Sequence, residues 1–167
     1  MSSPLQIFIE DTGVYIYDHV GAEYLTKTIN SIRSAIRDLR DQFIDEPDYL
    51  AAAILCEMFK KHKEHCEMIN EQMVKERVRP LYPDPGRPGD RFGIGNSRYG
   101  VYYLITINWT KGTVKLEPYP VDPDGEDLLS FKEERERLGI RQCEIEELLK
   151  KGIRALSKKA RLSSPKS

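Results

Sequence analysis

The sequence lacks any hydrophobic run long enough to cross a bilayer, and it is poor in cysteine. A membrane-spanning helix needs about 20 consecutive apolar residues, and charged residues interrupt the apolar stretches of this chain well before that length. The chain has 3 cysteines among its 167 residues, a number that is too small for a disulfide framework and also odd. No basic segment followed by an apolar block stands at the start, so no secretion signal is expected. These absences predict a cytoplasmic protein with no membrane partner.

A strong net charge is also missing. Lys and Arg total 26 and Asp and Glu total 27, which gives a formal net charge of −1. That balance predicts no general attraction to nucleic acid. The charges are unevenly distributed, because acidic residues outnumber basic ones between Asp122 and Glu147, whereas the segment from Lys150 to Lys166 has basic residues and no acidic one. The basic C-terminal segment is therefore a separate candidate for nucleic-acid contact.

Two β-hairpins are predicted from alternating apolar residues and turn formers. Apolar residues recur at every second position between Leu5 and Ile9, as on one face of a strand. Turn formers at 11–13 separate this run from a second β-prone run at 14–17. The segment 101–117 repeats the pattern, with a turn near its middle.

Helices are predicted from apolar residues at spacings of three and four. Residues 25–43 carry such a stripe, which is typical of one face of a helix. A second helical pattern covers 48–78, directly after Pro47, a residue that suits a first helical turn. The two long helices predict an antiparallel helical hairpin. Shorter helices are expected at 128–138 and 145–156.

The order of these elements predicts an α+β fold, in which two β-hairpins form a four-stranded antiparallel sheet packed against a long helical hairpin and a C-terminal helix. Residues 1–162 are expected to form one domain, and 163–167 a flexible tail. Residues 80–100 are rich in Pro and Gly and predict a long loop. Because long loops often carry function, we expect this one to bind a partner. Its candidate residues are Arg87, Asp90, Arg91, Asn96, Arg98 and Tyr99.

Two local patterns resemble catalytic or metal sites, but each lacks residues that the chemistry needs. The Asp-Thr-Gly triplet at 11–13 matches the aspartic-protease triplet in letters, yet no second triplet supplies the other carboxylate. We therefore interpret it as a hairpin turn. His62, His65 and Cys66 lie within one helical turn, which offers at most two well-placed ligands of the four in a structural zinc site. We predict neither a metal nor a cofactor.

Three classes of function are compatible with the sequence. The favoured one is a non-catalytic protein-binding component, subunit or regulator of a larger intracellular assembly. Self-association through the helical hairpin is expected if Ile32 and Ile36 on its narrow apolar stripe face a partner, whereas they belong to the core of the monomer if they do not. The first alternative is a nucleic-acid-binding module that uses the basic C-terminal helix. The second is an enzyme whose site is dispersed along the chain. The nucleic-acid contacts would come from Lys151, Arg154, Lys158, Lys159 and Arg161.

Overall fold

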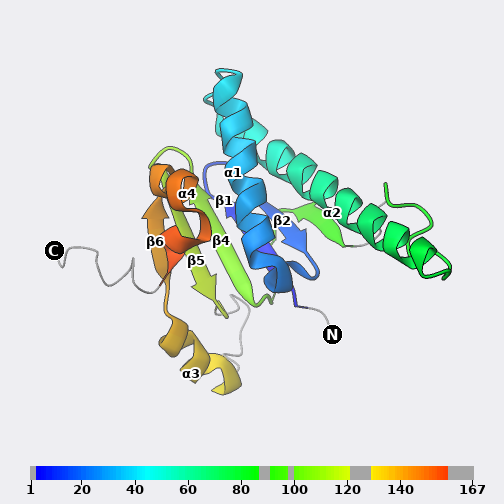
Figure 1. The fold of residues 1–167 in the computed structure, drawn as a ribbon. Helices are drawn as coiled ribbons and strands as arrows, with labels where there is room; N and C mark the ends of the chain where they lie inside the picture. The colour runs from blue at the N-terminus through cyan, green and yellow to red at the C-terminus, as the bar shows by residue number, and fades with distance from the viewer. Residues whose placement is uncertain (1–2, 87–90, 98–99, 121–128, 158–167) are drawn as a thin grey trace.

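A β-sheet forms one layer of the protein, and α1 and α2 lie over one of its faces (Figure 1). The computed structural model describes residues 3–86, 91–97, 100–120 and 129–157. The α+β class is confirmed. The strands are β1 (Leu5–Ile9), β2 (Val14–Asp18), β3 (Phe92–Gly95), β4 (Tyr103–Asn108), β5 (Thr113–Pro118) and β6 (Arg141–Glu144). The α-helices are α1 (Leu25–Asp41), α2 (Leu50–Lys75), α3 (Leu129–Leu138) and α4 (Ile145–Lys151), with short 3-10 helices η1 (Gly21–Tyr24), η2 (Pro47–Tyr49) and η3 (Gly152–Leu156).

The sheet is mixed and has six strands, in the order β3-β2-β1-β4-β5-β6. Both predicted hairpins are confirmed, as β1–β2 and β4–β5. The predicted four-stranded antiparallel sheet is wrong in two respects: β1 and β4 pair in parallel, and β3 and β6 add antiparallel strands at the two edges. Parallel strands need a long crossover connection between them. The segment between the two hairpins, which contains α1 and α2, provides this connection, so β4 can run in the same direction as β1.

The strand β3 lies inside the segment 80–100, which was predicted to be a continuous loop. Its sequence is Phe-Gly-Ile-Gly, and the two glycines hide the alternating pattern that reveals other strands. β3 pairs along β2, from Phe92 opposite Asp18 to Gly95 opposite Tyr15. Part of the predicted loop is therefore an edge strand.

The hydrophobic core lies between the sheet and the helical hairpin. The apolar stripe of α1 faces the sheet, and Ile29, Ile32 and Ile36 are fully buried there. Each such side chain stabilises the fold by about 1.5–3 kcal/mol through burial. Of the two alternatives for Ile32 and Ile36, contact with a partner or burial in the core, the structure supports the core, because both have 0% of their surface exposed within one chain.

The predicted C-terminal helix is shorter than expected. α4 ends at Lys151, because Gly152 adopts φ 61°, a left-handed conformation that favours glycine and terminates helices. The chain continues as η3, which packs against α1. Arg33 and Arg37 of α1 donate hydrogen bonds of 2.7 and 2.6 Å to the carbonyl of Leu149. The predicted tail at 163–167 lies outside the described residues.

The helix α2 extends beyond the sheet, so that its C-terminal half projects from the main body (Figure 1). Its 26 residues correspond to roughly 39 Å at 1.5 Å per residue. Cys66 is its last buried residue. Neither this helix nor any other in the described part of the chain is both long and apolar enough to cross a membrane.

The burial of the α1 stripe leads to a test of the core assignment. Replacing Ile36 with Ala should lower the free energy of unfolding by about 2–5 kcal/mol, because a large buried side chain is lost. The control is Phe43→Ala, two residues beyond the end of the same helix, where Phe43 is 95% exposed; it should stay within about 0.5 kcal/mol of wild type. Urea unfolding followed by circular dichroism measures both, and equal effects would contradict the assignment.

Candidate functional site

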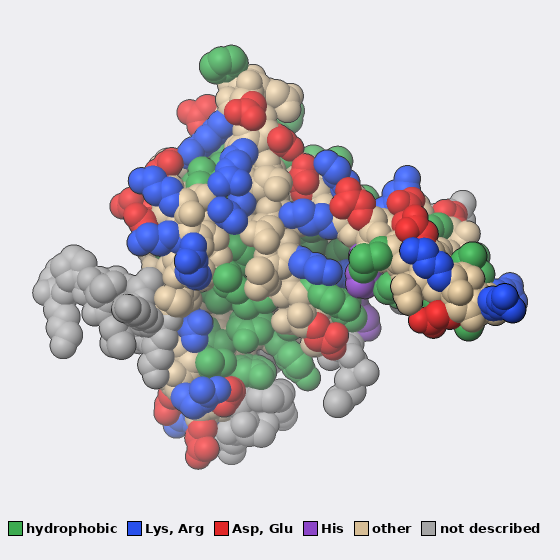
Figure 2. Space-filling view, viewed as in Figure 1, with side chains coloured by type: hydrophobic (Ala, Val, Ile, Leu, Met, Phe, Trp, Pro, Cys, Tyr) green, Lys and Arg blue, Asp and Glu red, His purple; other side chains and the backbone are tan. Residues whose placement is uncertain are grey.

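A groove opens between α1 and α2 where the two helices diverge. Its outer part has a volume of about 270 Å³ and continues into an inner cavity of about 30 Å³. The two parts share Lys27, Lys61 and His65, so we treat them as one feature, the α1–α2 groove. Histidine side chains mark the junction between the main body and the projecting arm (Figure 2). The outer part is lined by Lys27, Asn30, Lys61, Glu64, His65 and Met68.

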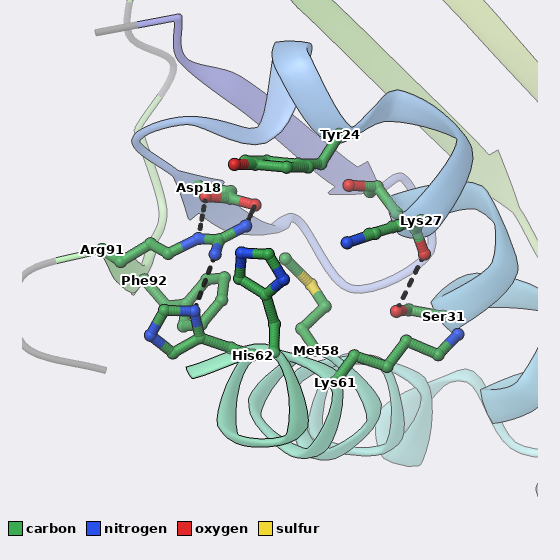
Figure 3. A pocket seen from close by; sticks show the side chains of 11 residues that line it. Asp18, Tyr24, Lys27, Ser31, Met58, Lys61, His62, Arg91 and Phe92 are labelled. Atoms are coloured by element: carbon green, nitrogen blue, oxygen red, sulfur yellow. Dashed lines mark hydrogen bonds and ion pairs between the residues drawn. The ribbon is translucent and has the colours of Figure 1, made fainter. Parts of the chain in front are cut away.

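The inner end of the groove is built around a buried carboxylate. Asp18, the last residue of β2, has a side chain that is 1% exposed. Arg91 approaches it edge-on, with Nε 3.0 Å from Oδ1 and Nη2 3.3 Å from Oδ2 (Figure 3). The backbone amide of Val20 donates a further hydrogen bond of 3.2 Å to Oδ1. The carboxylate is therefore paired through both oxygens, as a buried charge requires.

The same guanidinium also contacts α2. Its Nη1 donates a 2.7 Å hydrogen bond to Nδ1 of His62, which requires that nitrogen to be unprotonated. Asp18, Arg91 and His62 thus form one network, which joins β2, the start of β3 and α2 (Figure 3). We call it the Asp18–Arg91–His62 network.

Aromatic rings enclose the guanidinium of Arg91. Its Cζ lies 5.2 Å from the ring centre of Tyr24 and 4.8 Å from that of Phe92, distances typical of cation–π contacts. Tyr24 reaches this position because η1 begins close to the sheet. A Cβ atom at Gly21 would lie only 2.8 Å from Cβ of Leu5, so glycine is needed for that approach.

Burial and neighbouring cations together disfavour the protonated forms of the groove side chains. Burial, and then the charge of Arg91, lower the pKa of His62 below 6.5. Burial, followed by Lys27 and Arg91, lowers the pKa of His65 in the same direction. Burial is also the main cause that lowers the pKa of Lys61, against the opposing effect of nearby acidic residues. At His62 and His65, neighbouring cations therefore oppose protonation in addition to burial.

Two ammonium groups line the groove without a salt bridge to a described carboxylate, although the charges of Glu57 and Glu64 act on Lys61. Lys27 Nζ lies 5.1 Å from the ring centre of Tyr24, and Lys61 reaches the groove from α2 (Figure 3). Neither forms a salt bridge with a residue that the structure describes. The two helices thus bring Lys27, Lys61 and His65 together in a region suited to negative charge.

No protein-family model matches this chain, and no curated protein or solved structure matches it either. Its function must be argued from the groove and its surroundings.

The structure separates the residues predicted for the partner-binding loop. Arg91 belongs to the Asp18–Arg91–His62 network, with its side chain 19% exposed. Asn96 is exposed just after β3. The remaining loop candidates, Arg87, Asp90, Arg98 and Tyr99, lie outside the described residues.

Only two residues of the predicted nucleic-acid surface are described. Lys151 forms a 3.0 Å salt bridge with Glu147, and the Nε of Arg154 donates a 3.5 Å hydrogen bond to the carbonyl of Lys151. Both contacts are local to the end of α4. The other candidates, Lys158, Lys159 and Arg161, lie outside the described residues.

The triplet at 11–13 is a hairpin turn, as predicted. Asp11 accepts hydrogen bonds from the backbone amides of Trp109 and Thr110, at 2.6 and 3.1 Å, and from the Thr110 hydroxyl. Partial burial favours a higher pKa for Asp11, but these hydrogen bonds outweigh it and hold the pKa below its usual value. Asp11 therefore fastens one hairpin turn to the other.

The histidine–cysteine pattern of α2 does not form a metal cluster in the described part of the chain. There, no three His, Cys, Asp or Glu side chains lie close enough together to hold a metal ion. Cys66 Sγ is 3.5 Å from Nε2 of His62, but the other nitrogen of this ring already accepts from Arg91. A cation at His62 would also meet the positive guanidinium.

Sequence reasoning missed most of the groove, because its residues come from distant parts of the chain. One signal was available. Asp18 follows Ile16 at the strand spacing of two, so the alternation places a carboxylate on the core-facing side of β2. A buried carboxylate predicts a cationic partner, although the sequence does not say that the partner is Arg91.

Removing Arg91 should cost far more stability than removing an exposed arginine. Arg91→Ala leaves the Asp18 carboxylate buried without its partner and should lower the free energy of unfolding by about 3–5 kcal/mol. The control is Arg40→Ala, which removes a salt bridge between side chains that are 43% and 60% exposed and should cost at most about 1 kcal/mol.

A second variant separates loss of the ion pair from simple loss of packing. Adding Asp18→Asn to Arg91→Ala removes the unpaired charge, so the double variant should be more stable than the sum of the single effects predicts. Chemical unfolding of wild type, Arg91→Ala, Asp18→Asn and the double variant measures this difference. Strict additivity would contradict the described pairing.

Proposed function

We propose that this protein is a non-catalytic protein-binding component, and that an acidic segment of its partner occupies the α1–α2 groove. The observation that supports this proposal is the convergence of Lys27, Lys61 and His65 from two helices, without a salt bridge from either lysine to a described carboxylate. The charges of Lys27 and Arg91 already lower the pKa of His65, because positive groups held close together raise one another's energy. A negatively charged partner relieves this repulsion, so charge complementarity favours an acidic occupant.

The shape of the groove favours a polypeptide segment over an enclosed small molecule. Its outer part, at about 270 Å³, is smaller than the pockets of roughly 300–1,000 Å³ that surround drug-sized ligands. It is lined by residues of both α1 and α2. Met68 lies at this outer end with 58% of its surface exposed. Methionine adapts to varied apolar side chains, so we expect the bound segment to carry an apolar residue beside its acidic ones.

The projecting half of α2 would extend the contact surface. Isolated helices of fewer than about 12–15 residues are marginal in water, and the helix beyond Cys66 lies outside the region of sheet contact. Asn70 partly stabilises it through hydrogen bonds of 2.6 and 2.9 Å to the carbonyl and amide of Tyr82. The large apolar side chains exposed in this region are Met68, Val74, Val78 and Leu81. A bound partner would cover this apolar surface.

Binding rather than catalysis is supported by the state of the reactive groups. Burial raises the pKa of the Cys143 thiol to about 12 and also raises the pKa of Cys66, so both thiols are protonated and poorly nucleophilic at neutral pH. Asp18 and His62 are occupied by Arg91. We also propose a cytoplasmic location, where the three unpaired cysteines would stay reduced.

The proposal is tested with a fluorescent peptide of repeating Glu-Leu-Glu-Gly units. Wild type should bind it in a salt-sensitive manner, and replacing both Lys27 and Lys61 with Glu should weaken binding by at least about tenfold, the equivalent of 1.4 kcal/mol. Lys111→Glu makes the same kind of charge change in the β4–β5 turn, away from the groove, and should bind like wild type. Fluorescence anisotropy measures all three proteins.

Two results would contradict the proposal. One is equal binding of a peptide in which Gln replaces every Glu. The other is unchanged binding by the Lys27 and Lys61 double variant while its circular dichroism and melting temperature remain those of wild type. Stronger binding of a mixed-sequence oligonucleotide than of the acidic peptide would favour the nucleic-acid alternative instead.

A further inference from the structure

We propose that the inner end of the α1–α2 groove binds a phosphoryl group, carried on a phosphorylated serine or threonine of the acidic segment. This inference rests on the proposed function, since it specifies the chemistry of the group that the partner presents. The groove residues that carry it are Lys27, Lys61 and His65.

The first argument is the match of charge and of hydrogen-bond donors. A phosphoryl group carries about −1.5 to −2 charges at neutral pH and three acceptor oxygens, whereas a carboxylate carries one charge and two oxygens. Lys27 comes from α1, and Lys61 and His65 come from successive turns of α2, so cationic or titratable side chains of both helices line the inner end. One carboxylate would leave part of this positive charge uncompensated.

The second argument is that the carboxylate lining the inner cavity does not compete for these cations. Asp18 lines the inner cavity, but both of its oxygens are held by Arg91. Glu64 lines only the outer part. The inner end therefore keeps a positive excess, and its cavity of about 30 Å³ is large enough for a single water-sized group. An oxygen of the phosphoryl group fits this space, while the rest of the segment lies in the outer groove.

Arg91 supplies a fixed positive charge behind this position. Asp18 and His62 hold the guanidinium through three hydrogen bonds, and the rings of Tyr24 and Phe92 flank it. Because these contacts set its position before binding, little conformational entropy is lost when a ligand arrives. The long side chains of Lys27 and Lys61 then supply adjustable donors.

Binding of a dianion should be linked to proton uptake at His65. Burial, Lys27 and Arg91 lower the pKa of His65 in the free protein, and a phosphoryl group beside it should raise that pKa. Binding should therefore tighten as the pH falls from 8 toward about 6.5, as long as the phosphoryl group remains largely dianionic. The charged or titratable groups around His65 are Asp18, Tyr24, Lys27, Lys61, His62, Glu64 and Arg91.

The test compares three peptides that differ at one central position of the Glu-Leu-Glu-Gly repeat: serine, glutamate or phosphoserine. Wild type should bind the phosphoserine peptide at least about tenfold more tightly than the glutamate peptide. His65→Gln should reduce this preference and remove its dependence on pH, and Lys27→Gln with Lys61→Gln should abolish it. Lys111→Gln should behave as wild type in anisotropy measurements at pH 6.5 and 8.

Inorganic phosphate provides a second readout that needs no substitution. In nuclear magnetic resonance titrations, phosphate should raise the pKa of His65, whereas chloride at equal ionic strength should not. Equal affinity for the glutamate and phosphoserine peptides, with no phosphate effect on His65, would overturn the phosphoryl inference and leave the acidic-segment proposal standing. Failure of all three peptides to bind would overturn both.

Discussion

The arrangement of this protein depends on the burial of the Asp18 carboxylate at the end of β2. A buried charge is tolerated only when it is paired and hydrogen-bonded, and the bond pattern shows how this requirement is met. Arg91, far along the chain, binds both oxygens, and its backbone carbonyl accepts a 2.9 Å hydrogen bond from the amide of His19. These contacts bring the start of β3 against β2, and His62 ties the same guanidinium to α2. One ion pair thus links the sheet edge, the segment before β3 and the long helix.

The same ion pair determines the chemistry of the α1–α2 groove. Because Arg91 satisfies Asp18, the one carboxylate that is buried among the described residues does not neutralise Lys27, Lys61 or His65. The proposed binding of an acidic, phosphorylated segment follows from this imbalance. In this proposal, stability and binding belong to different members of one cluster. The Asp18–Arg91–His62 network holds the elements together, while the cations beside it line the groove.

The local elements were predictable from the sequence, but their long-range arrangement was not. The alternation at Leu5–Ile9 and the three-four spacing of α1 are strong signals, because each reflects a single buried face. β3 gave no such signal, since half of its residues are glycines and its place beside β2 depends on contacts such as the Asp18–Arg91 pair. The stripe containing Ile32 was detected correctly, yet periodicity does not distinguish a face that meets the sheet from one that meets a partner. The groove could not be predicted, because Lys27, Lys61 and Arg91 converge only in the folded chain.

The most direct test of this account is the protonation state of His62. Its Nδ1 accepts from Arg91 only when unprotonated, and burial and the guanidinium charge lower its pKa in the folded protein below the unfolded value of 6.5. The corresponding stability is fully present above pH 6.5 and is lost as the pH falls toward the lower folded pKa. Long-range proton–nitrogen correlation spectra, recorded as the pH is lowered from neutral, should show that His62 is still neutral at pH 6.5, with an unprotonated Nδ1, and that it becomes protonated only at a lower pH. A His62 pKa at or above 6.5, or a proton on Nδ1 at neutral pH, would contradict the described network.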